Sequence, residues 1–166
     1  KASSVSLLSG KYEWQALPNV PPPEMPQVNT VAQGAWQPNL ALDWGRLGVI
    51  NHRHTLTNKI RVNAQESILV LGTSEYVWRS FLLAEDLEQQ GADVHFASTT
   101  RSPIAIGHAI KTARAFSDNY GLGIANFSYN VLPEQYSRIF ICSETPASMV
   151  DTQLLNALNA QVIVDD

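Results

Sequence analysis

The pattern of hydrophobic and polar positions changes near residue 68. From there to the end of the chain, short apolar runs alternate with segments long enough to form helices. Short apolar runs bounded by turn residues are typical of strands buried on both faces. Strands that alternate with helices predict an α/β fold with a mainly parallel sheet and right-handed crossovers, here a doubly wound, Rossmann-like sheet. The predicted strands are Ile68–Leu71, Val94–Ser98, Arg138–Ser143 and Gln161–Val164.

The segments between these runs predict three helices. Val77–Gln90 has apolar residues partly at three-to-four spacing, with Gly91 as its stop. Ile104–Phe116 carries apolar residues on one side, and Met149–Leu158 lies between the last two predicted strands. Ile124–Val131 is a candidate for a further extended segment.

The first part of the chain is rich in proline. Proline lacks a backbone donor and restricts the residue before it, so this composition predicts an extended arm or linker. We therefore divide the chain into an arm over residues 1–40 and an α/β domain over residues 41–166. Trp14 and Trp36 lie on the flanks of the proline-rich stretch and indicate that the arm packs against other residues. The prolines between residues 17 and 38 are Pro18, Pro21, Pro22, Pro23, Pro26 and Pro38.

The turn before the second predicted helix has the chemistry of a phosphate-binding corner. Ser102 suits an N-cap and Pro103 the first helical position. A helix start favours anions, and the hydroxyls of Thr99 and Thr100 and the guanidinium of Arg101 add phosphate donors. An ordinary capped helix start with a surface arginine explains the same residues, and the spacing does not separate the two interpretations.

Polar residues also follow the other predicted strands. Thr73, Ser74 and Glu75 come after the first strand, and Glu144 and Thr145 come after the third. Parallel sheets bind ligands outside the carboxyl ends of their strands, so we expect these residues to line a binding site. Glu75 and Glu144 are candidates for reading hydroxyl groups, or for proton transfer if burial raises the pKa of either carboxyl. Polar loops are nevertheless common in any α/β domain.

The net charge of −4 conceals a basic segment. Gly45–Asn63 contains four Lys or Arg residues, two histidines and no acid, so it could face a phosphorylated ligand or RNA. A solvated loop that pairs with the acidic half of the chain is the alternative. Arg46 is the favoured ligand residue, because glycines flank the Arg46–Leu47 pair, and we expect it to approach Arg101. We expect no metal site at His52 and His54, because no cysteine or acid lies nearby in the sequence.

Several classes of function lack their motifs. The chain has no G-x-G-x-x-G, no G-x-x-x-x-G-K-[ST] and no G-x-S-x-G sequence, so we predict no cofactor and recognise no catalytic motif. Aromatic residues make up 8% of the chain without a stacking motif, which disfavours nucleic-acid binding. Without a long apolar stretch or a signal peptide, and with Cys142 as the single cysteine, we expect no membrane contact and a cytoplasmic protein. Both ends of the chain look like cuts in a longer protein.

The sequence Thr100-Arg101-Ser102-Pro103 resembles the motif that names the TRSP domain, and the similarity runs from about Gly45 to the C-terminus. TRSP domains usually follow a phosphoribosyltransferase domain in bacterial operons associated with tellurium resistance. Further segments resemble the family pattern in the same order, namely Leu71–Tyr76, Leu82–Glu85, Asn119–Gly121 and Ser143–Pro146.

The resemblance implies a partner, a phosphoribosyltransferase domain of the same or a neighbouring chain. Our first hypothesis is a domain that binds a phosphorylated nucleoside- or ribose-like metabolite, in the biosynthesis of a nucleoside-like compound linked to tellurium resistance. The second is a non-catalytic regulatory or assembly module that docks on the transferase or on a second copy, as in a homodimer. The third is an enzyme in its own right, a group transferase on a nucleoside.

Overall fold

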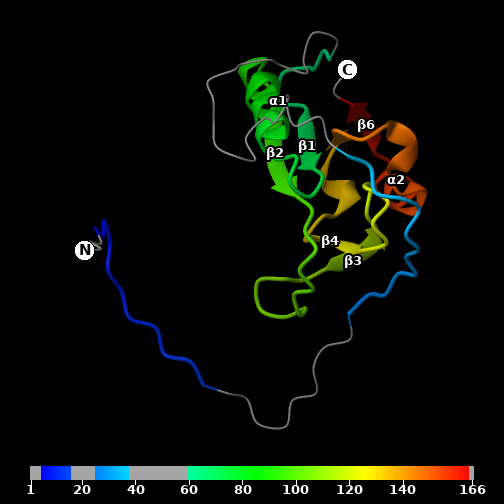
Figure 1. Ribbon diagram of the computed structural model, residues 1–166. Helices are drawn as coiled ribbons and strands as arrows, with labels where there is room; N and C mark the ends of the chain where they lie inside the picture. Colours follow the sequence, from blue (N-terminus) through cyan, green and yellow to red (C-terminus); the bar gives the residue numbers. More distant parts are fainter. Residues whose placement is uncertain (1–4, 16–24, 38–59, 165–166) are drawn as a thin grey trace.

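The computed structural model describes residues 5–15, 25–37 and 60–164, which form an α/β fold with a separate antiparallel hairpin (Figure 1). The four-stranded sheet has the order β2-β1-β5-β6, and every neighbouring pair is parallel. This confirms the mainly parallel α/β sheet and all four predicted strands. The strands are β1 (Ser67–Gly72), β2 (Asp93–Ser98), β5 (Arg138–Ser143) and β6 (Gln161–Val164).

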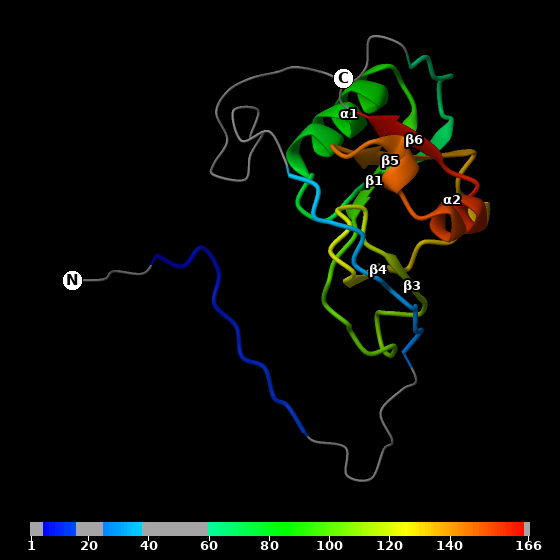
Figure 2. The same cartoon turned by 45° about the vertical axis from the view of Figure 1, so that its right-hand side comes forward.

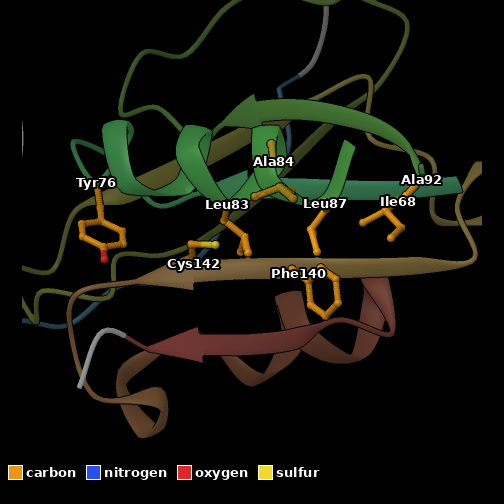
Figure 3. Packing of buried hydrophobic residues seen from close by; sticks show 9 residues of the cluster. Ile68, Tyr76, Leu83, Ala84, Leu87, Ala92, Phe140 and Cys142 are labelled. Carbon is orange, nitrogen blue, oxygen red and sulfur yellow. The ribbon is translucent and has the colours of Figure 1, made fainter. Parts of the chain in front are cut away.

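The side chains of β1 alternate between two apolar clusters, one on each face of the sheet. On one face, Ile68 packs with Leu87 of helix α1 (Trp78–Gln89), as Figure 3 shows. On the other face, Leu69 packs with Leu154 of helix α2 (Thr152–Leu158). Burying such side chains stabilises the fold by roughly 1.5–3 kcal/mol each. In the part of the chain that the structure describes, neither helix is long and apolar enough to cross a bilayer.

The helix predicted over Ile104–Phe116 is wrong. A loop leads instead to β3 (Ala113–Ser117), which pairs antiparallel with β4 (Ala125–Tyr129), the extended segment expected within 124–131. Gly107 (φ 154°) and His108 (φ 48°) depart from helical geometry, and the amides of Gly107 and Ile110 each donate to the other's carbonyl. A glycine in a helix interior lowers stability by about 1 kcal/mol relative to alanine, so Gly107 disfavours a helix in this segment.

The remaining helix boundaries are set by local caps. Helix α2 begins later than predicted, because Ala147–Met149 forms a separate 3₁₀ turn. The Asp151 carboxylate caps α2 by accepting from the amide of Gln153 at 2.8 Å. Its other oxygen accepts from the amide of Ser117 at 2.7 Å, so the same side chain ties the helix to the end of β3.

Part of the N-terminal arm lies along the hairpin side of the domain (Figure 2). The amides of Gln33 and Trp36 donate to the carbonyls of Gly121 and Tyr120, at 3.0 and 2.8 Å. Trp36 therefore packs as expected, whereas Trp14 is 79% exposed. Residues 16–24, which hold most of the prolines, lie outside the described residues, and the division at residue 40 stays a prediction.

Cys142 gives the fold a measurable dependence on pH. Burial raises the pKa of this thiol from about 9.0 to about 12, and the hydrogen bond with the Ser80 side chain offsets only part of this effect. Because the folded pKa is the higher one, the thiol's contribution to stability is complete below about pH 9. It is then lost as the pH rises towards 12.

We predict that the free energy of unfolding falls more steeply above pH 9 in the wild type than in Cys142→Val. The difference in slope approaches about 1.4 kcal/mol per pH unit. Urea titrations between pH 8 and pH 11 measure it. The substitution removes only the thiol, so equal slopes would contradict a buried, neutral thiol.

Candidate functional site

Three polar turns meet at the carboxyl ends of the parallel strands. After β1, the amide and hydroxyl of Thr73 donate to the carbonyl of Cys142 at 3.1 and 3.0 Å, which joins the ends of β1 and β5. The amide of Ser74 donates to Thr99 Oγ1 at 2.8 Å, which joins the ends of β1 and β2. The structure therefore brings Thr73, Ser74 and Thr99 together, as the strand pattern predicted.

Asn119 lies at the centre of this edge. Its Nδ2 is 3.4 Å from Thr73 Oγ1, 3.1 Å from Ser143 Oγ and 3.0 Å from Thr145 Oγ1. The two hydroxyls after β5 also contact each other at 2.8 Å. Asn119 is 5% exposed, so these contacts form a buried polar cluster with no formal charge. From the sequence, Asn119 was named only within a segment that resembles the family pattern, and this role was missed.

Asp118 builds the turn that presents Asn119. One carboxylate oxygen accepts from the amides of Tyr120 and Leu122 at 3.0 and 2.9 Å, and the other accepts from the amide of Ile124 at 2.9 Å. An aspartate that accepts from amides a few residues ahead is a common turn former, and this signal was present in the sequence. Gly121 and Gly123 belong to this turn, which joins β3 to β4.

The two candidate glutamates differ in their surroundings. Glu144 is half-buried, and the Tyr120 hydroxyl donates to its Oε1 at 2.7 Å. This contact fixes the carboxylate beside the Asn119 cluster, between Ser143 and Thr145 in the chain. Glu75 is exposed in the turn that precedes α1.

The predicted phosphate corner is not a helix start. The amide of Ser102 donates to Thr100 Oγ1 at 3.1 Å, and the amide of Ile104 donates to the Tyr129 hydroxyl at 2.7 Å. That hydroxyl in turn donates to the Ser102 carbonyl at 2.7 Å. These bonds use the amides that a helix N-terminus would leave free, so the helix-dipole argument for an anion site is wrong.

Arg101 remains as the cation of this turn. It follows Thr100, which pairs with Phe127 through N···O contacts of 3.0 and 2.7 Å, so its backbone position is fixed by β4. The side chain is exposed, and among the described residues no ion pair or hydrogen bond engages its guanidinium. Its fork is therefore available for an anion.

The predicted second cation, Arg46, lies outside the described residues, as do His52 and His54. Of the basic segment, only residues 60–63 are described. The carbonyl of Arg61 accepts from Arg138 Nη1 at 3.0 Å, beside the first residue of β5. This end of the segment thus lies at the amino side of the sheet, away from the polar turns.

A family model described as "TRSP domain C terminus to PRTase_2" matches residues 45–159, more than half of the chain. The chain belongs to the TRSP domain family. The family's description places the TRSP domain C-terminal to a PRTase_2 domain, so it accompanies that domain. No significant match was found among curated proteins or among solved structures. The TRSP match includes all three polar turns and the Asn119 cluster, but it excludes the arm over residues 25–37.

We predict that Asn119→Ala destabilises the TRSP domain by about 1–3 kcal/mol, because it leaves buried hydroxyls without their amide partner. Urea unfolding followed by circular dichroism measures the change. Asn156→Ala, on the exposed face of α2, is the matched control and should change stability by no more than about 0.5 kcal/mol. Equal effects of the two variants would mean that the Asn119 cluster contributes nothing to the fold.

Proposed function

We propose that the TRSP domain binds a phosphorylated nucleoside- or ribose-like metabolite at the carboxyl edge of its sheet. The observation that carries the proposal is the joining of three strand ends into one polar edge. There Glu144 is held by Tyr120, and Arg101 follows Thr99 in the same turn. A hydrogen-bonded carboxylate can accept from sugar hydroxyls, and a free guanidinium can hold a phosphate.

The sheet supports this location. The chain passes from β1 to β2 on one side and from β5 to β6 on the other, with α1 and α2 on opposite faces. We infer that the sheet is Rossmann-like and doubly wound, with its switch point between β1 and β5. Ligands bind at such a point outside the carboxyl ends of the strands. Thr73 and Thr145 lie at that position, on either side of the Asn119 amide.

The residues divide by role in the proposed site. Arg101 holds the phosphate, with the Ser102 hydroxyl near it in the chain, and Thr100 fixes the loop through the Ser102 amide. Glu144 reads ribose hydroxyls, and Glu75 is the exposed alternative. Thr73, Ser74, Thr99 and Thr145 maintain the shape of the edge, and Arg46 stays a proposed second phosphate ligand.

The family supplies the context for this function. Because the TRSP domain is C-terminal to a PRTase_2 domain, we propose that its ligand is a substrate or product of that domain, in the same or a neighbouring chain. The compound made would be nucleoside-like and linked to tellurium resistance.

The docked arm favours a second candidate function, a regulatory or assembly module without catalysis. Thr30 Oγ1 donates to the carbonyl of Gly123 at 2.8 Å, and two backbone bonds join the same segments. A domain that binds an extended segment in this way could organise the transferase or a second copy without any small ligand.

We predict that Arg101→Ala weakens binding of a phosphorylated ligand by about 1.5–3 kcal/mol, the range for hydrogen bonds to charged groups. Isothermal titration with ribose 5-phosphate, nucleoside monophosphates and phosphoribosyl diphosphate measures the change. Arg61→Ala removes an exposed cation at the opposite edge of the sheet and should leave the affinity unchanged.

Two outcomes would contradict parts of this proposal. If the wild type binds none of these compounds, the ligand-binding function is wrong and the module function stands. If it binds one of them and Arg101→Ala binds equally well, Arg101 is not the phosphate ligand.

A further inference from the structure

The arm approaches the Asn119–Gly123 turn more closely than any side chain would allow. A Cβ atom on Gly121 would lie 2.3 Å from the Gly34 carbonyl oxygen, and one on Gly123 would lie 2.6 Å from the Ala32 amide nitrogen. Both glycines also have positive φ, 73° and 71°. Two features thus favour glycine in this turn: its own backbone conformation and the arm that lies against it (Figure 2).

Tyr120 connects this docked segment to the candidate site. Its carbonyl accepts from the Trp36 amide at 2.8 Å, and its ring lies 6.1 Å from the Trp36 ring, centroid to centroid, at a tilt of 56°. The far end of the same side chain donates to Glu144 Oε1 at 2.7 Å. Tyr120 is 6% exposed, so it is buried between the arm and the strand ends. The Trp36 ring is thus one of the groups that enclose the Tyr120 ring.

We propose that Trp36 is a positioning residue for Glu144, acting through Tyr120, so that docking of the arm and binding at the site are coupled. This inference rests on the proposed ligand site. Release of the arm removes the indole from the Tyr120 ring and frees that ring to rotate, which breaks the hydrogen bond that holds the carboxylate. Coupling between two binding events is reciprocal, so a bound ligand stabilises the docked arm by the same factor.

The coupling gives the arm a role beyond that of a spacer. Residues 25–37 precede the family match at residue 45, on the side where the family places a PRTase_2 domain. A pull or a contact from that side acts first on the arm, and through Trp36 and Tyr120 it reaches the carboxylate. The partner expected to dock or release the arm is therefore the PRTase_2 domain, which the family places on its N-terminal side.

The first measurement needs no ligand. Hydrogen exchange of the amides at positions 33 and 36 reports docking, and the ¹³C signal of the Glu144 carboxyl reports its hydrogen bond, with Glu144→Gln for assignment. In Trp36→Leu and Gly123→Ala we expect both amides to exchange faster and the Glu144 signal to move. In Tyr120→Phe, which removes only the hydroxyl, we expect the Glu144 signal to move while the amides stay protected.

Two controls match these variants. Trp14→Leu makes the same change at a tryptophan that is 79% exposed. Gly91→Ala places a side chain at a φ of 97°, where the nearest atoms of another residue are 3.8 Å away, so it introduces backbone strain without touching the arm. Both should leave the amides at positions 33 and 36 and the Glu144 signal as in the wild type.

The second measurement is titration with ribose 5-phosphate. We expect Trp36→Leu and Tyr120→Phe to weaken binding by about fivefold or more, and the ligand to slow exchange of the two arm amides in the wild type. If the arm is released and the Glu144 signal does not move, the positioning role is wrong even if the ligand binds. If the signal moves but the wild type binds no phosphorylated compound, the proposed function fails and the link between arm and carboxylate stands.

Discussion

Strand β1 must have each of its faces covered and each of its edges paired, and the other elements satisfy these needs. Its side chains from Ile68 to Leu71 are at most 2% exposed. Helix α1 covers one face and α2 the other, while β2 and β5 pair with its two edges. Because three parallel strands must then end together, their polar turns come together too. The candidate site is thus a consequence of burying one strand.

The cluster at these strand ends is made of neutral groups. Hydroxyls and one amide satisfy each other around Asn119, and none of these groups carries a charge. Such a network holds its geometry at a lower desolvation cost than an ion pair would. Of the charged groups, Glu144 lies beside this cluster, where the Tyr120 hydroxyl holds it, and Arg101 is exposed in the turn after β2. The groups that fix the shape of this edge are thus distinct from the charged groups of the proposed ligand site.

Local pattern was sufficient for the sheet and insufficient for the hairpin. The four apolar runs predicted their strands because a strand buried on both faces is legible in a few consecutive residues. The helix expected over residues 104–116 is wrong because apolar residues on one side of a short segment also occur in a loop followed by a strand. Gly107 marked the break in the sequence. Asn119 was out of reach for another reason, since its partner Thr73 is 46 positions away and no local pattern reports such a contact.

The close contact between arm and turn has a consequence for the sequences of related domains. A left-handed backbone by itself accepts asparagine better than most other non-glycine residues, whereas the carbonyl of Gly34 and the amide of Ala32 leave no room for a Cβ atom. Glycine at positions 121 and 123 is thus required by the close contact with the arm as well as by the turn. A relative with asparagine at either position would keep the turn, but its arm could not lie in the same place. The residues at these two positions would therefore distinguish family members with a docked arm from members without one.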